Sequence, residues 1–334
     1  MFPYVLKKSG VEEKSLRIYS WANRIDESVL QNFQNKTGIK VYLNYYESVE
    51  ELLTKLEVMP HIDCDLMLPS SYAIPRMIDA HVIKQIDISR CNFIEKIYPV
   101  FLKISNTGEQ LYALPLYWDV FGIGYNAKTV QNQAITLDLL FDKNKIIGSQ
   151  VGMTDEPREA IFLAAQYLNF DLNHLTSDIL KKIRRLLRDQ KAWVGAYSDS
   201  QQGYFLASDT FDVVASDREI ICRQMLTNAF VKFALLPKGS MLRVDSMVIN
   251  ALSNKDDLIY EFLNYLFSEE VVLHHAQQFC LLPTMPDVFN LVEKKYIGID
   301  DFYIGSTKFQ SLLLFNLNLS QKEINDFWMR FKAS

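Results

Sequence analysis

The opening of the chain alternates strand-like and helix-like patterns of apolar residues. Residues 16–20 and 39–45 alternate apolar and polar positions, a pattern that favours strands with one buried face. The segment between them has apolar residues at helical spacing and ends at Gly38, a residue type that commonly terminates helices. Helical spacing returns at residues 49–56. This β-α-β-α order predicts the beginning of an open α/β sheet.

A third short apolar run, Asp65–Pro69, ends in the turn-forming residues 70–72. We expect that turn to lie at the carboxyl edge of the sheet, which is where open α/β sheets bind ligands. Further helices are predicted at residues 74–78, 154–168, 175–187 and 258–267, and further strands at 211–215 and 231–236.

Two longer strand-like runs, Tyr112–Asn126 and Met241–Asn250, lie at comparable distances from the two ends of the chain. In the first run, bulky residues alternate with Gly122 and Gly124, which predicts a strand through a crowded place. We interpret both runs as crossings between two discontinuous α/β lobes, with the ligand site in the cleft between them. The predicted bounds are 1–120 plus 246–290 for the first lobe and 121–245 plus 291–334 for the second.

The composition is that of an ordinary globular protein with enough length for two domains. Of its 334 residues, 49% are apolar and 22% are charged, and the net charge of −5 argues against nucleic acid or an anionic membrane surface as a partner. No run approaches the roughly 18 apolar residues of a membrane span. Residues 1–14 lack the charged-then-apolar order of a signal peptide, so the sequence leaves open whether a leader was removed or the protein stays inside the cell.

Motifs for metal, cofactor or covalent chemistry are not found. The four cysteines are scattered, without CxxC or zinc-type spacing, and are expected to be small buried residues. His274 and His275 are adjacent, and adjacent helical residues project about 100° apart, so we expect a helix surface rather than a shared metal ion. The pair Gly122 and Gly124 lacks the third glycine of a dinucleotide loop. The sequence therefore predicts no metal, no cofactor and no enzyme activity.

Five segments occur in the order and spacing of one family, namely LRIYSWANRIDESVLQNFQNKTGIKVYLNYYES, CDLMLPSSYAIPRM, YALPLYWDVFGIGYN, RVDSMVIN and LLPTMP. Through these segments the chain resembles, from Leu16 to Lys332, the periplasmic spermidine/putrescine-binding proteins of polyamine ABC transporters. The resemblance implies a two-lobed periplasmic-binding-protein fold of type II, the venus-flytrap fold, with two hinge crossings. It further implies a periplasmic receptor that closes on a polyamine and delivers it to an ABC permease, without enzyme activity. We expect a monomer.

The resemblance places aromatic and hydroxyl groups at the ligand. Trp21 matches the tryptophan that follows the family's opening strand, and Trp118 matches the tryptophan of its P-x-x-W crossing segment. Ser70 and Tyr72 match the serine and tyrosine of its P-S-x-Y turn. Trp21, Tyr72 and Trp118 would then hold the methylene stem of a polyamine. Two alternatives remain open: the tryptophans could be core residues, and Ser70 and Tyr72 could be turn residues only.

The same resemblance places carboxylates at the ammonium groups. Glu156 and Glu159 fall at the family's two acidic ligands at a helix start, although the first is usually aspartate, and Asp245 matches its amine-binding aspartate on the return strand. Carboxylates suit this role because a buried ammonium group without a partner would be very costly. Glu159 could instead cap its helix. Asp245 needs a partner inside its apolar strand, either a bound cation or an arginine such as Arg243.

Three positions depart from the family's pattern. Arg24, Ala215 and Arg243 stand where the family has aromatic residues, which removes aromatic walls and adds two guanidinium groups. A bound cation would be repelled unless those arginines point away or pair with acids such as Asp217 or Asp119. A second hypothesis is therefore that the same fold binds a solute with a carboxylate or phosphate on Arg243, with Arg24 as a further anchor. A third is a receptor-like scaffold that has lost its ligand and serves as an interaction partner.

Overall fold

The computed structural model describes residues 14–58, 63–106, 110–131, 133–145, 148, 150–314, 317 and 319–334. The chain separates into two compact units, each made of two stretches of sequence. Unit 1 comprises Met1–Leu116 and Asp245–His275, and unit 2 comprises Tyr117–Val244 and Ala276–Ser334. Of the N-terminal segment considered for a signal peptide, all but Lys14 lies outside the described residues.

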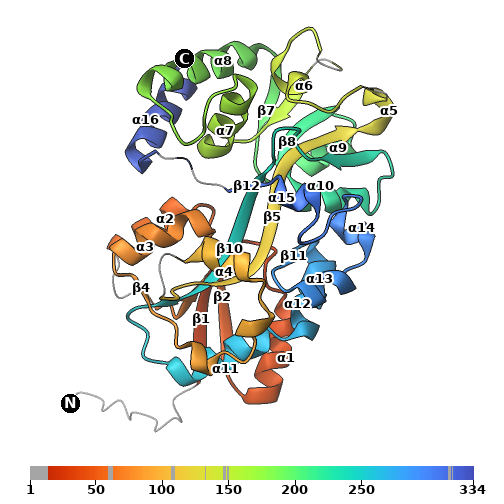
Figure 1. The fold of residues 1–334 in the computed structure, drawn as a ribbon. Coiled ribbons are helices and arrows are strands. Elements are labelled where there is room, and N and C mark those ends of the chain that lie inside the picture. The colour runs from red at the N-terminus through yellow and green to blue at the C-terminus, as the bar shows by residue number, and fades with distance from the viewer. Residues whose placement is uncertain are drawn as a thin grey trace, which may run out of the picture. The chain divides into compact units, whose positions relative to one another are not determined.

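Unit 1 opens with the β-α-β-α order that the apolar pattern predicts (Figure 1). Gly38 ends the first helix in a left-handed conformation, with a φ of 73°, and its N–H donates to the Gln34 carbonyl. The predicted helix stop is thereby confirmed. The elements of unit 1 are β1 (Ser15–Ser20), α1 (Glu27–Thr37), β2 (Lys40–Tyr45), α2 (Val49–Val58), β3 (Leu66–Met67), η1 (Ser71–Ala73), α3 (Ile74–Asp79), β4 (Ile83–Lys84), η2 (Ile88–Arg90), η3 (Ile94–Lys96), α4 (Pro99–Ser105) and α11 (Asp256–Leu266), where η marks a short 3₁₀ helix.

The sheet of unit 1 is mainly parallel. β1 pairs in parallel with both β2 and β3. The second half of β10 (Met241–Asn250) runs antiparallel to β3 and β4. The carboxyl ends of β1, β2 and β3 therefore lie at one edge of the sheet, where the chain continues into Trp21, Tyr46 and Ser70.

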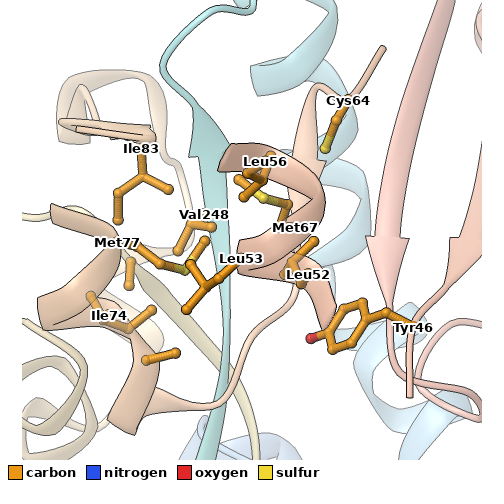
Figure 2. Close-up of a cluster of buried hydrophobic side chains, with 12 residues drawn as sticks. Tyr46, Leu52, Leu53, Leu56, Cys64, Met67, Ile74, Met77, Ile83 and Val248 are labelled. Carbon is orange, nitrogen blue, oxygen red and sulfur yellow. The ribbon is translucent and has the colours of Figure 1, made fainter. Parts of the chain in front are cut away.

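The core of unit 1 lies where α2 and α3 cover this sheet. Leu53 of α2 and Met77 of α3 meet Met67 of β3 and Val248 of β10 in one cluster of buried side chains (Figure 2). Burying a side chain of this size contributes about 1.5–3 kcal/mol. The partly buried aromatic residues that follow β1 and β3 pack against the same cluster, so a rigid core supports that edge of the sheet.

Unit 2 is a second α/β body with its own mixed sheet (Figure 1). β5 is antiparallel to β8, β9 and β11, whereas β6 is parallel to β7 and β8, and the first half of β10 is parallel to β12. Its elements are β5 (Leu114–Asn126), α5 (Ala127–Val130), α6 (Asp138–Phe141), β6 (Val151–Met153), α7 (Pro157–Tyr167), α8 (Ser177–Gln190), η4 (Lys191–Trp193), β7 (Val194–Tyr197), α9 (Gln202–Ala207), β8 (Val213–Asp217), α10 (Arg218–Met225), β9 (Val231–Ala234), β11 (Leu282–Pro283), α13 (Pro286–Leu291), α14 (Lys294–Ile297), α15 (Thr307–Gln310), β12 (Leu313–Leu314) and α16 (Gln321–Lys332).

The predicted helices and strands of the later chain are present with shifted ends. The helix predicted at residues 154–168 begins only at Pro157, because Glu156 is its N-cap. The helices predicted near residues 175–187 and 258–267 are α8 and α11, and the two predicted strands are β8 and β9. Across the described part of the chain, none of the helices combines the length and the apolar character that crossing a membrane requires.

The chain passes from one unit to the other at three points. It does so within β5 after Leu116, within β10 after Val244, and within α12 (Glu269–Phe279) after His275. β5 and β10 are the two strands interpreted from the sequence as crossings. Residues 276–290, which that interpretation assigned to the first lobe, belong to unit 2. The predicted lobe bounds, and a cleft between the lobes, stay a prediction.

Candidate functional site

In unit 1, the candidate residues gather at the carboxyl edge of the parallel strands. Trp21 follows β1, Tyr46 follows β2, and Ser70 follows β3 after two residues. Asp245 of β10 forms an isolated antiparallel bridge with Ser70, and the next residue, Ser246, donates its N–H to the Pro69 carbonyl at 2.9 Å. Backbone pairing therefore carries the Asp245 carboxylate to the edge at which open α/β sheets bind ligands.

Both carboxylate oxygens of Asp245 have partners within unit 1. Arg24 Nε donates to Oδ2 at 2.8 Å, and Ser70 Oγ donates to Oδ1 at 2.8 Å. Asp245 and Arg24 are 8% and 7% exposed, so this ion pair is largely desolvated and depends on its hydrogen bonds. From the sequence, Asp245 was expected to have a cationic partner, either a bound ligand or a neighbouring arginine such as Arg243. Within unit 1 that cation is Arg24.

An aromatic pair borders this ion pair. The rings of Trp21 and Tyr46 lie 4.5 Å apart between centroids, and the Tyr46 hydroxyl donates to the Leu68 carbonyl at 2.7 Å. The indole N–H of Trp21 is buried, and no described residue accepts a hydrogen bond from it. Such an unpaired donor is costly, which makes it a candidate for contact with a ligand. Tyr72, in η1, is partly buried against the core cluster of unit 1.

In unit 2, a group of polar side chains, most of them acids, also lies where parallel strands end. Thr154 follows β6, Asp199 lies two residues beyond β7, and Asp217 is the last residue of β8. Glu159 comes from the first turn of α7, and Arg243 comes from β10. Because β6 is parallel to both β7 and β8, their carboxyl ends meet at one edge and bring these side chains together.

Arg243 joins two of these acids. Its Nη1 lies 2.7 Å from Glu159 Oε1, and its Nη2 pairs with Asp217 Oδ2. The Glu159 side chain is 3% exposed, while those of Asp217 and Arg243 are 13% and 20% exposed. Asp217 Oδ1 is buried without a hydrogen-bond donor among the described residues. Of the two acids named from the sequence as possible partners of the departing arginines, Asp217 pairs with Arg243. Asp119, in contrast, pairs with Arg218, at 2.6 Å from Nε to Oδ1.

The electrostatics of this cluster favour an additional positive charge. Burial raises the pKa of Asp217 to about 7, with Asp119 and Glu219 adding to the rise and Arg243 opposing it. Burial likewise raises the pKa of Glu159 well above its usual range, again opposed by Arg243. Two buried carboxylates share one guanidinium, so the group attracts either a proton or another cation.

The start of α7 engages two further acids. Glu156 is the N-cap of α7, and its carboxylate accepts from the Arg158 N–H at 3.0 Å. Asp199 Oδ1 accepts from the N–H groups of Asp155 and Glu156 at 2.7 and 3.1 Å and lies 2.9 Å from Thr154 Oγ1. The carboxylate of Glu159 contacts Arg243 and Thr154, which belong to other parts of the sheet edge. Glu159 therefore joins these segments together, beyond any role in capping.

Trp118 has the surroundings of a core residue. It is 1% exposed, and its indole N–H donates to the Pro283 carbonyl at 2.8 Å. Its ring lies 5.3 Å from that of Phe309, 5.4 Å from that of Phe302 and 6.0 Å from that of Phe289, measured between centroids. These contacts engage the ring and its only hydrogen-bond donor within unit 2.

The histidine and cysteine expectations have mixed outcomes. His275 is fully buried, and its Nε2 accepts from the Asp26 N–H at 3.0 Å, so the predicted helix surface is wrong for this residue. Burial also lowers the pKa of His275 to about 3. The four cysteines are buried free thiols, as expected. Within the described ranges, no three or more side chains of His, Cys, Asp or Glu gather in a way that could hold a metal ion.

Several residues of these clusters were not identified from the sequence. Tyr46, Thr154 and Asp199 are the main ones, and Arg24 was noticed only as a departure from the family's pattern. The signal that identifies the first three is positional. Each lies just beyond a predicted or observed parallel strand, at the edge where such strands carry functional side chains.

Comparisons with known proteins agree with this architecture. The model of the family described as bacterial extracellular solute-binding protein matches residues 28–297. The putrescine-binding periplasmic protein PotF of Escherichia coli is 28% identical over 288 residues, covering 79% of this chain and 76% of the relative. The spermidine/putrescine-binding periplasmic protein of Escherichia coli is 24% identical over 269 residues, covering 80% of this chain and 76% of the relative.

The solved structures show the fold. One from Listeria monocytogenes, provisionally described as a spermidine/putrescine ABC transporter, superposes with a TM-score of 0.86 at 25% identity, covering 96% of this chain and 99% of that one. The fold class predicted from the sequence, a two-lobed α/β periplasmic-binding-protein fold, is confirmed.

Proposed function

Because this chain belongs to the bacterial extracellular solute-binding proteins, we propose that it is a periplasmic receptor that binds a polyamine and delivers it to an ABC transporter. Its relatives in Escherichia coli are named for putrescine and spermidine, which supports this ligand class. The family consists of solute-binding proteins, and we accordingly propose that the chain binds its solute without chemical conversion. Closure of the lobes on the ligand, and a monomeric state, stay predictions.

The observation that carries the proposal is the acidic cluster of unit 2. An ammonium group needs charged acceptors when it leaves water, because its desolvation is otherwise very costly. The carboxylates of Glu159, which is buried, and Asp217, whose side chain is 13% exposed, both pair with Arg243, and Asp217 Oδ1 has no donor among the described residues. An ammonium group at Asp217 would supply both the missing hydrogen bond and the missing charge.

We propose that the ligand-binding residues include those predicted from the sequence at the two sheet edges. Trp21 and Tyr72 would hold the alkyl stem, and Ser70 would orient Asp245. The acids are Glu156, Glu159, Asp245 and, in addition, Asp217. Trp118 is left out, because its ring and N–H are engaged in the core of unit 2. The alternative of an anionic solute on Arg243 stays a prediction. An anion would have to compete there with the two carboxylates that already bind the guanidinium.

Calorimetric titration of the ligand-free protein with putrescine and spermidine tests the proposal. The protein is unfolded and refolded first to remove a co-purified ligand. We expect a Kd of about 1 μM or tighter, and a stabilisation of about 2.7 kcal/mol when the ligand is at a hundred times its Kd. Asp217→Asn should weaken binding at least ten-fold, because the amide cannot neutralise an ammonium group.

The matched control is Asp189→Asn, which makes the same chemical change at an exposed acid of α8. It should leave the affinity unchanged. No heat and no shift in melting temperature with either amine, in protein shown to be folded, would sink the polyamine receptor. A melting shift with a dicarboxylate instead would favour the anionic alternative.

A further inference from the structure

Unit 2 contains two cysteines, Cys222 and Cys280, which come from different stretches of the chain. Cys222 lies in α10, in the first stretch of unit 2, and Cys280 follows α12, in the second stretch. Both are free thiols in this structure, and both side chains are fully buried. The remaining cysteines, Cys64 and Cys91, belong to unit 1.

Shared contacts bring these two cysteines together. Arg218, which precedes Cys222 by one helical turn, donates through Nη2 to the Cys280 carbonyl and through Nη1 to the Tyr296 carbonyl at 3.1 Å. Cys222 Sγ lies 3.2 Å from the same Tyr296 oxygen. The two thiols also contact each other, because a hydrogen bond between them lowers the pKa of Cys222 and raises the pKa of Cys280.

The backbone of Cys280 is unusual for a residue with a side chain. Its φ of 57° lies in the left-handed region. Cys280 directly follows α12, at the position where glycine commonly ends a helix because glycine adopts this conformation without steric cost. A residue with a Cβ atom is uncommon there. The chain therefore places a side chain at a costly position, and this side chain contacts the thiol of Cys222.

We propose that Cys222 and Cys280 form a disulfide bond when the chain folds in an oxidising compartment. The relatives of this chain are periplasmic proteins, and disulfides form and persist in the periplasm. This inference concerns a covalent link within unit 2, and it does not depend on the identity of the ligand.

The oxidant is another disulfide, RSSR, supplied by a protein or by a small thiol compound. The Cys222 thiolate attacks one sulfur of RSSR and releases RS⁻, which forms a mixed disulfide. The Cys280 thiolate then attacks the Cys222 sulfur and releases the second RS⁻. The two cysteines lose two protons and two electrons in total, and RSSR is reduced to two thiols.

The burial of both thiols determines when this exchange takes place. An oxidant cannot reach them in the folded protein, so the bond forms before α10 and the segment after α12 pack together. The Tyr296 carbonyl keeps Arg218 as a donor after Cys222 has lost its proton. The bond therefore leaves that buried oxygen with a hydrogen-bond partner.

The bond would close a loop of residues 223–279. The chain leaves unit 2 within this loop, after Val244, and returns to unit 2 at Ala276. The loop thus contains the whole second stretch of unit 1, and the bond ties α10 to the point at which the chain re-enters unit 2. Closing a loop of this length restricts the unfolded chain, and the folded state is stabilised accordingly.

The test is the number of free thiols after refolding. The full chain is reduced, unfolded and refolded in a mixture of reduced and oxidised glutathione, then unfolded again in acid and alkylated with iodoacetamide. We expect two alkylated cysteines by mass spectrometry, and peptide mapping should assign them to Cys64 and Cys91. Refolding in excess dithiothreitol should give four. Four alkylated cysteines after oxidative refolding, or a bond between any other pair, would overturn the inference.

Substitution connects the bond to stability. A strong reductant should lower the melting temperature of the oxidised protein by about 5 °C or more, because the long loop is released. Cys222→Ser should leave three alkylated cysteines and a melting temperature that does not respond to the reductant. Cys91→Ser, the same change at a buried cysteine of unit 1, should keep the wild-type response. An equal response to the reductant in wild type and Cys222→Ser would contradict the assigned bond.

Should Cys222→Ser not fold, the thiol count of the wild-type protein still decides. None of these measurements uses a ligand. A failure of amine binding would therefore refute the proposed function alone, whereas four free thiols after oxidative refolding would refute this inference alone.

Discussion

The surroundings of Asp217 disfavour the ionised form of its carboxyl group. Its carboxylate faces Arg243 of β10, but also the acids Asp119 of β5, Glu219 of α10 and Glu159 of α7. Burial is the largest cause of its raised pKa. Since the raised pKa lies near neutral pH, a proton and a ligand ammonium group would compete for the same carboxylate.

The free energy of unfolding should depend on whether Asp217 holds this proton. Between the ordinary value of 3.8 and the folded-state pKa of about 7, the folded protein holds a proton that the unfolded chain has released. The Asp217 contribution to the free energy of unfolding is therefore present at low pH and falls as pH rises towards 7. Asp217→Asn removes it, so we expect the variant to become more stable relative to wild type as pH increases.

Urea unfolding of both proteins at about pH 5 and pH 8 measures this difference. The raised pKa of Glu159 acts in the same direction but is present in both proteins. Asp189→Asn, at an exposed position, should follow the wild-type pH dependence. An equal pH dependence in wild type and Asp217→Asn would contradict the assigned environment of Asp217.

Arg218 and Arg243 show how similar side chains can serve different purposes. Arg218 is fully buried, and it donates to Asp119 as well as to the carbonyls of Tyr296 and Ile297. It connects β5 and α10 to the segment around α14. Arg243 has a side chain that is 20% exposed and lies between two acids. Arg218 therefore holds segments of unit 2 together, whereas Arg243 is part of the candidate site.

Among the elements, β5 is a long strand that is buried along almost its whole length. A Cβ atom at Gly122 would lie 2.5 Å from the Ala234 carbonyl oxygen of β9. One at Gly124 would lie 2.7 Å from Ile221 Cδ1 of α10 and 2.8 Å from Leu206 Cδ1 of α9. The prediction of a strand through a crowded place is confirmed. Glycine is required here by close packing, since neither residue has a positive φ.

Alanine at either glycine should destabilise unit 2 by about 1–3 kcal/mol, the usual range for overpacking. The two sites should respond differently to a second change. Ile221→Val removes the methyl group that faces Gly124, so it should recover about 0.5–2 kcal/mol in the Gly124→Ala background. At Gly122 the nearest atoms belong to Ala234 and Phe233, not to Ile221. Ile221→Val should therefore recover no stability in the Gly122→Ala background.

Denaturant unfolding of the two double-mutant cycles provides these free energies. Ile221→Val alone serves as the control for the lost methyl group, which typically costs about 0.5–1.5 kcal/mol. Additive effects at Gly124, with no recovery, would contradict direct contact between that position and α10.

For the molecule as a whole, neither unit is a continuous stretch of sequence. Unit 1 takes its antiparallel strand from Asp245–Asn250, which pairs with β3 and β4 after the chain has built most of unit 2. Asp245 reaches Ser70 and Arg24 by the same return. The site edge of unit 1 is therefore complete only when a late segment of the chain is in place.

A chain ended after Val244 should consequently fail to form a stable unit 1. It lacks the half of β10 that carries Val248, a member of the buried cluster, and it lacks the whole of α11. α11 alone buries five side chains, and at about 1.5–3 kcal/mol each their contribution is comparable to the net 5–15 kcal/mol of a typical domain. We expect the amide hydrogens of unit 1 residues to lose, in this fragment, the protection from exchange that they have in the full chain. Full protection of the unit 1 residues in that fragment would show that unit 1 folds without the second half of β10 and α11.

The sequence by itself determined the local elements and the family. α1 is an example: Asp26 caps its start by accepting from the Ser28 N–H at 2.7 Å, and Gly38 ends it. Such features involve residues a few positions apart, so the pattern of neighbouring side chains encodes them. The alternation in β1 and β2 predicted strands for the same reason, because it specifies which face is buried.

Only the tertiary structure decided which charges meet. Arg24 and Asp245 are 221 positions apart, and Arg243 and Glu159 are 84 apart, so their pairing depends on which strand ends lie side by side and on the reach of each side chain. Periodicity predicts a buried face but not the neighbour on it. Trp118 and His275 were ambiguous or misassigned for this reason, since their burial comes from segments distant in sequence. Local sequence patterns and the family resemblance were enough to predict the fold. The charge of the site depends instead on which residues, distant in sequence, pack together.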